Sequence, residues 1–90
     1  MNNTELKTYL QTFLGKSVNI GSDLRFALSA KDIEHYEHSL GTVAVKNYGG
    51  AGILIDVYEE DDHVWVTMDY GVSWIVTSAN LTIEPYIETH

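Results

Sequence analysis

Four consecutive acids at positions 59–62 are the most conspicuous group of chemically capable side chains in this 90-residue chain. Clustered carboxylates can hold a hard cation such as calcium, but a calcium loop takes its ligands from alternate positions, around a glycine and with a distal bidentate acid. The run Glu59, Glu60, Asp61 and Asp62 has neither that spacing nor the glycine. It predicts a solvated turn, or a contact for a positively charged partner, in preference to a metal site.

Two other groups of side chains resemble reactive sites without completing one. His35 and His38 are three residues apart and can share a helix face, but a zinc site needs three or four ligands and His63 lies in a distant hairpin. No serine lies in a nucleophile elbow or an oxyanion-type motif. The sequence therefore predicts a protein that is not an enzyme and that uses neither a metal nor a cofactor.

The glycine-rich segment 49–52 has the composition of a phosphate cradle but not its setting. Neither a helix N-terminus nor the lysine of such loops follows it, and β-rich runs flank it on both sides. A hairpin turn is the prediction for this segment.

The charges are divided unevenly along the chain. All five Lys and Arg residues lie in the first 46 positions, where five acids balance them, so the eight acids of residues 47–90 carry the whole net charge of −8. Aromatic side chains on strands can stack nucleic-acid bases, but phosphate binding depends on Lys and Arg. The sequence therefore predicts no direct binding of nucleic acid.

An acidic surface with flat aromatic side chains suits a positively charged protein instead. The residues expected to bind such a partner are Asp56, Tyr58, Glu59, Glu60, Asp61, Asp62, Trp65, Asp69, Tyr70 and Trp74. Trp65 and Trp74 have a competing role, because an aromatic residue in an alternating strand often belongs to the core.

Helical signals dominate the first 41 residues. Apolar residues recur at helical spacing over 4–14, where Asn2 or Asn3 can cap the helix and Gly15 can end it. Residues 17–20 predict a short strand and residues 24–28 a second extended piece. A capping pattern at 29–32 predicts another helix near 30–40.

From residue 42 onward the apolar period changes from 3.6 to two. Residues 42–48, 53–59, 63–70 and 72–77 predict strands, with hairpin connections at 49–52, 60–62 and Gly71, and residues 82–84 predict a last strand that Pro85 ends. The expected fold is a single α+β domain over residues 1–90: two short N-terminal helices followed by an antiparallel meander of four or five strands. One core is expected to contain Leu10, Phe13, Ile33, Leu40, Val45, Ile55 and Val66.

The chain has no cysteine, no basic N-terminal leader and no apolar run of membrane-spanning length. A cytoplasmic protein that does not associate with membranes is expected.

Two resemblances add to this prediction. Residues 74–83, a strand and a short break before the last strand, resemble the end of an SH3-like barrel. The run Gly15 to Ile20, followed by Ser22, Asp23 and Leu24, resembles the turn, strand and acidic contact segment of the phage uracil-DNA glycosylase inhibitor family. More broadly, the chain is similar to small acidic phage inhibitors, including anti-CRISPR proteins, and to immunity proteins that neutralise basic toxins.

The resemblance implies a non-enzymatic inhibitor that occupies the cationic groove of a nuclease, a glycosylase or another nucleic-acid-binding enzyme, as a DNA mimic does. Such a phage protein would act in the host cytoplasm. The alternative is an SH3-like interaction module that forms a homo-oligomer or a subunit of a virion or other complex, with its acidity serving solubility. Sequestration of a small molecule between subunits is a third alternative.

Overall fold

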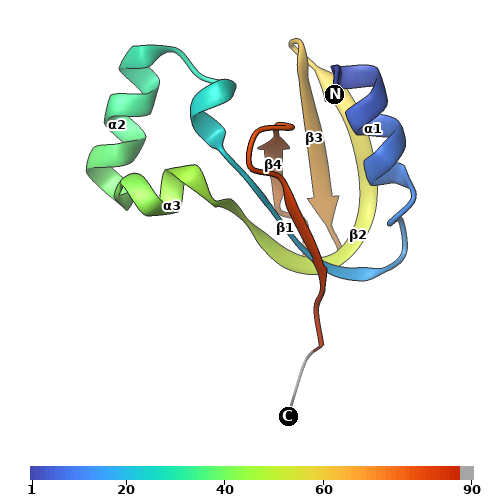
Figure 1. Ribbon diagram of the computed structural model, residues 1–90. Helices are drawn as coiled ribbons and strands as arrows, with labels where there is room; N and C mark the ends of the chain where they lie inside the picture. Colours follow the sequence, from blue (N-terminus) through green and yellow to red (C-terminus); the bar gives the residue numbers. More distant parts are fainter. Residues whose placement is uncertain (88–90) are drawn as a thin grey trace.

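The computed structural model describes residues 1–87 and contains helices and a five-stranded antiparallel sheet (Figure 1). The elements are α1 (Asn3–Gln11), β1 (Ser17–Ser22), the 3₁₀ helix η1 (Leu24–Phe26), α2 (Ala30–Leu40), α3 (Thr42–Lys46), β2 (Tyr48–Glu60), β3 (His63–Met68), β4 (Ser73–Val76) and β5 (Thr82–Pro85). The strand order is β4-β3-β2-β1-β5. The predicted α+β class is confirmed.

Strand β2 is long enough to take part in both halves of the sheet. Its first half pairs with β1 and its second half with β3, and a register shift between Leu54 and Asp56 marks the bend that Figure 1 shows. The far ends of the two halves are also tied together, because the Thr77 N–H donates to Ser22 Oγ and the Asp23 N–H donates to the Ala79 carbonyl, both at 2.9 Å. The sheet thus curls into a small, partly open barrel with β4 and β5 at its edges.

Helix α1 covers one side of this barrel. It begins with the predicted capping box, in which the Glu5 N–H donates to the side chain of Asn2 and the Glu5 carboxylate accepts from the Asn2 N–H. The buried side chains of α1 are Leu6 and Leu10. They join a core formed by the inward residues of the strands, among them Ile20, Leu54, Val66 and Trp74. The helix is therefore part of the same core as the sheet.

Two predicted extended segments are helical. Residues 42–48 were expected to form a strand, but Thr42–Lys46 is α3, which starts after Gly41 at φ +91° and buries Val45. In the predicted piece 24–28, the Asp23 side chain accepts from the Arg25 N–H and thereby caps the 3₁₀ turn η1. Residues 42–46 are therefore helical despite their β-branched side chains, and the Asp23 cap favours a turn over an extended chain at 24–26.

The predicted hairpin turn at 49–52 is also wrong, because β2 runs straight through these glycines. Gly50 and Gly52 face the inside of the barrel, where the rings of Trp74 and Tyr70 approach the strand. A Cβ on Gly52 would lie 2.7 Å from Tyr70 Cε1, and one on Gly50 would lie 3.4 Å from Trp74 Cη2. The glycines therefore provide space for two aromatic rings.

Residues 24–46, comprising η1, α2 and α3, form a helical arm that lies beside the barrel (Figure 1). Val45 and Leu24 anchor the arm by burial, whereas α2 buries none of its residues and contacts mainly α3 and η1. Of the predicted core, Leu10, Val45 and Val66 are buried, Phe13 and Ile33 are partly buried, and Leu40 and Ile55 are exposed. Leu40 is exposed because α2 packs mainly on α3 and η1, and Ile55 is exposed because it lies at the register shift.

Within residues 1–87, no helix combines the length and the apolar character needed to cross a membrane.

Candidate partner-binding surface

The outward face of β2, β3 and β4 brings together side chains that are far apart in sequence. Cross-strand pairing aligns Tyr58 with Trp65 and Trp65 with Ile75, so the three form one row. The rings of Tyr58 and Trp65 are stacked with centroids 6.3 Å apart and planes 6° apart. The Trp65 indole N–H donates to the Glu60 carbonyl at 3.2 Å, which fixes the ring orientation. The result is a partly exposed apolar row in the middle of this face, and we use the name aromatic row for these three residues.

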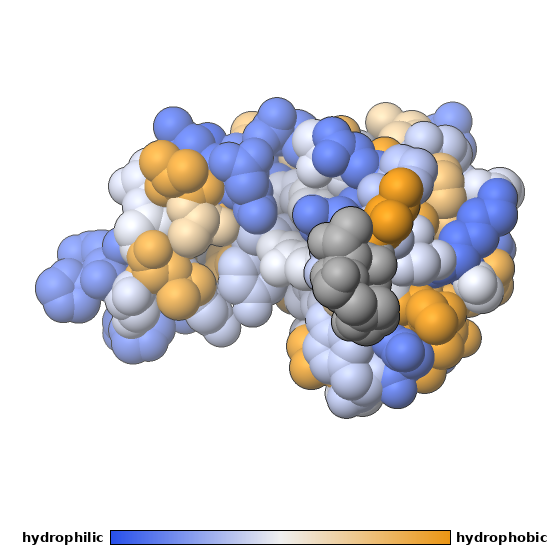
Figure 2. Space-filling view, turned by 90° about the horizontal axis from the view of Figure 1, so that it is seen from below, coloured by the Kyte–Doolittle hydropathy of each residue, from blue (hydrophilic) through white to orange (hydrophobic). Residues whose placement is uncertain are grey.

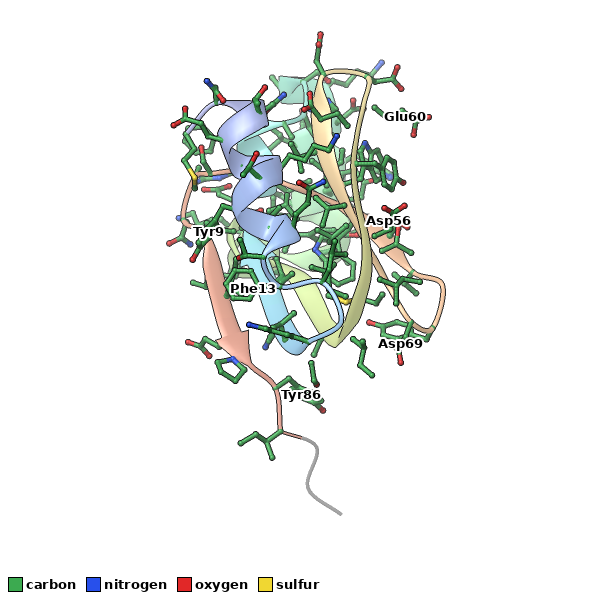
Figure 3. All side chains as sticks on the ribbon, turned by 90° about the vertical axis from the view of Figure 1, so that its right-hand side faces the viewer. Tyr9, Phe13, Asp56, Glu60, Asp69 and Tyr86 are labelled. Atoms are coloured by element: carbon green, nitrogen blue, oxygen red, sulfur yellow. The ribbon has the colours of Figure 1, made fainter. Side chains whose placement is uncertain are left out.

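Carboxylates lie along one side of that row. Asp56 and Glu60 flank Tyr58 on the same outward face of β2, and Figure 3 shows Glu60, Asp56 and Asp69 following one another along the molecule. Antiparallel strands rise about 3.4 Å per residue, so Glu60 and Asp56 are roughly 14 Å apart. We use the name acidic strip for the exposed residues Asp56, Glu60, Asp61, Asp62 and Asp69.

The tip of the β2–β3 hairpin contributes two members of the acidic strip. Asp61 and Asp62 form the two-residue turn with φ of 52° and 63°, a left-handed conformation that side chains other than Gly, Asn and Asp rarely adopt. The Asn3 side-chain amide donates to the Asp62 carbonyl, at 2.6 Å, and so joins the tip to the start of α1. The two carboxylates are held outward on a fixed backbone.

Within residues 1–87, no Lys or Arg forms an ion pair with the acidic strip. The ion pair found in residues 1–87 joins Asp23 to Arg25, with Arg25 Nη2 2.7 Å from Asp23 Oδ2. The side-chain hydrogen bonds from Arg25 hold the pKa of the buried Asp23 carboxyl below its usual value. This pair belongs to the junction of β1 with the arm, not to the acidic strip. In the strip, Asp69 Oδ1 accepts from the Ile53 N–H at 3.2 Å, and all five members are exposed.

Some predicted contact residues have other positions. Trp74 is 5% exposed and belongs to the core, so its assignment as a surface anchor is wrong. Its ring fills the space above Gly50, on the opposite face of β4 from Ile75. Glu59 is exposed but alternates with Glu60 and points away from the acidic strip. Tyr70 is 57% exposed, yet its ring covers Gly52 and its hydroxyl donates to the Ala51 carbonyl at 2.8 Å.

Sequence reasoning missed Ile75, which completes the aromatic row. The alternation of residues 72–77 predicts that Ile75 lies on the face opposite Trp74, but the pairing with Trp65 depends on the hairpin register. Among residues 1–87, no three His, Asp or Glu side chains are grouped so as to hold a metal ion. His35 and His38 are exposed on α2.

No family model matches the chain, and no curated protein or solved structure matches it either.

Proposed function

We propose that this protein is a non-enzymatic inhibitor that binds a basic nucleic-acid-binding enzyme and occupies the groove of its nucleic acid. The observation that carries the proposal is the acidic strip of five exposed carboxylates, in a half of the chain, residues 47–90, that has no Lys or Arg. A rigid array of negative charge presents to a cationic groove what the phosphates of DNA present. In this proposal the protein acts in the cytoplasm, where such an enzyme meets its substrate.

The aromatic row supports the same partner class. Tyr58 and Trp65 are large side chains whose orientation is already fixed by stacking and by the Trp65 hydrogen bond. Fixed aromatic side chains lose little conformational entropy on binding and are common at the centres of protein interfaces. The charges would accelerate the encounter, and the aromatic row would supply apolar contact afterwards.

The partner can be identified by capture from a cell lysate. The capture is done at low and at high salt, and the bound proteins are then identified. The proposal expects a basic nucleic-acid-binding protein whose association slows as salt screens the exposed charges. Competition is the decisive measurement, because a DNA mimic and DNA cannot occupy one groove together. The captured enzyme should lose its nucleic acid as this protein is added, and formation of a ternary complex would contradict the proposal.

Two matched variants separate the position of the charge from its amount. The strip variant carries Asp56→Asn, Glu60→Gln and Asp62→Asn, and the arm variant carries Asp32→Asn, Glu34→Gln and Glu37→Gln. Each loses three negative charges and changes the net charge from −8 to −5. Electrostatic steering contributes up to about 10²–10³ in association rate, so the strip variant should associate at least roughly tenfold more slowly at low salt than the arm variant. Equal rates for both variants would exclude the acidic strip as the contact.

A further inference from the structure

Strand β4 forms an open edge of the sheet. The Met68 N–H donates to the Val72 carbonyl at 2.9 Å, which makes 68 and 72 a hydrogen-bonded pair. Since hydrogen-bonded pairs alternate in an antiparallel ladder, Trp74 and Val76 direct their backbone groups toward β3. Ser73 and Ile75 therefore direct their N–H and C=O groups away from the sheet, and four backbone groups are available for pairing with another strand.

A groove follows this edge. A cavity of about 200 Å³ is bordered on one side by Ser73, Trp74 and Ile75 of β4 and on the other by Leu28 and Tyr36 of the helical arm. Figure 2 shows the arm and the barrel as two lobes with a recess between them. This volume is below the roughly 300–1,000 Å³ of pockets that enclose whole small molecules. It suits a side chain of a longer segment.

The walls of the groove indicate what such a segment must offer. Leucine and aromatic side chains predominate, which favours an apolar side chain. The indole N–H of Trp74 is buried and makes no hydrogen bond to the described residues, although a buried indole N–H usually has an acceptor. Because this N–H is buried, the polar groups that the groove offers a segment are instead those at the open edge of β4.

We propose that an extended segment of a basic partner protein adds to β4 as a sixth strand, with an apolar side chain in the groove and lysine or arginine at neighbouring positions. Strand addition takes its affinity from main-chain hydrogen bonds and its specificity from alternate side chains. The basic residues follow from charge complementarity, since the chain carries −8 and residues 47–90 contain no Lys or Arg.

A second copy of this chain fits the groove less well. Pairing of two β4 edges would bring a second barrel behind the added strand, whereas Leu28 and Tyr36 already stand across the groove. The arm thus lies on the side of β4 where a second barrel would have to be placed, whereas an added single strand brings no further layer with it. The inference goes beyond the proposed function, because the open edge and the acidic strip use different atoms, although Trp65 and Ile75 of the aromatic row also line the groove.

The test measures binding of three short amidated peptides to the whole protein by calorimetry. The first alternates lysine with valine, the second carries N-methyl groups on alternate residues of the first, and the third has glutamate in place of lysine. The lysine peptide should bind, and N-methylation should weaken it at least roughly tenfold because it removes backbone donors without changing charge. The glutamate peptide should also bind at least tenfold more weakly, because like charges repel.

Ile75→Pro removes one of the open donors and no ladder hydrogen bond, so it should fold and lose the peptide, whereas Ile75→Val should keep it. Amide hydrogen exchange of the unaltered protein tests the same point if the proline variant does not fold. The peptide should slow exchange at Ser73 and Ile75 by roughly tenfold or more, and Trp74 and Val76 should change little because their N–H groups are already paired.

Equal binding of the N-methylated peptide would overturn the inference, since charge alone would then explain the binding. If the glutamate peptide binds as tightly as the lysine peptide, the inference of a basic partner is wrong. If none of the three peptides binds, the inference of strand addition is wrong. A stable dimer in sedimentation, with Ser73 and Ile75 protected in the free protein, would show that a second copy is the occupant.

Discussion

Asp61 and Asp62 form the hairpin tip in a backbone conformation for which Asn-Gly is the preferred pair. A residue other than glycine in this left-handed conformation makes the folded state less favourable by about 1–3 kcal/mol, and Asp lies at the low end because its side chain tolerates the conformation. The combined change Asp61→Asn and Asp62→Gly should therefore raise the free energy of unfolding by roughly 0.5–1 kcal/mol. If the tip serves binding, the same change should slow association with the captured partner.

Urea unfolding and association kinetics measure these two effects. The control, Asp61→Glu with Asp62→Glu, keeps both charges but has a poorer turn, so it should be less stable while still binding rapidly. A tip variant that is more stable and binds as rapidly as the original would show that these acids have no role in recognition.

Asp23 links the charge of one residue to the stability of the barrel. Arg25 lowers the pKa of this carboxyl in the folded protein, below the usual 3.8. The stabilisation is therefore complete above pH 3.8 and is lost as the pH falls through the lower folded value. Asp23→Asn should lower the melting temperature at neutral pH, and the difference from the unaltered protein should shrink in acid. Asp32→Asn, an exposed control on α2, should not show this convergence.

At the scale of elements, α1 should contribute substantially to stability through Leu10, which is fully buried against the sheet. Leu10→Ala should lower the free energy of unfolding by about 2–5 kcal/mol. Leu14→Ala provides the matched control, because Leu14 is 44% exposed, and should cost much less. Equal effects in thermal unfolding would mean that α1 does not pack as described.

Elements with complete local signals could be predicted from the sequence. The capping patterns at Asn2 and Ser29 predict α1 and α2, and Gly71 predicts the turn between β3 and β4. Residues 42–48 could not be assigned correctly, because Val43 and Val45 have β-branched side chains although they belong to a helix. The role of Gly50 and Gly52 depends on aromatic rings about 20 residues later in the chain, and no local pattern shows it.

The candidate surface, like the fold, could be predicted from the sequence only in part. Alternation along β2 and β3 places Asp56, Tyr58, Glu60 and Trp65 on one face, and the structure brings them together there. Trp74 alternates in the same way, but its side chain points inward because the register pairs it with Val66, a core residue. The groove at β4 lies between elements distant in sequence, so only the tertiary structure shows it.

The whole molecule combines two parts that differ in packing. The barrel and α1 share one core, whereas α2 buries none of its residues. Regions with few buried contacts open at a lower free energy than the core. In amide hydrogen exchange, α2 should therefore lose its protected protons well before α1 and the central strands. Simultaneous exchange of α1 and α2 would show instead that the arm and barrel unfold as one unit.

The long strand β2 also has a consequence for the order in which the chain folds. Its pairing with β3, and that of β3 with β4, joins residues near each other in sequence, whereas β1 and β5 pair Gly21 with Thr82. Closing a long loop costs entropy before any contact is gained, so the β2–β3–β4 meander should form the folding nucleus and the β1–β5 pair should form after the transition state. In kinetic measurements, Val66→Ala should mainly slow folding and Ile83→Ala should mainly accelerate unfolding. The reverse pattern would place the nucleus at the termini, and the barrel would then close from its most distant pair of strands.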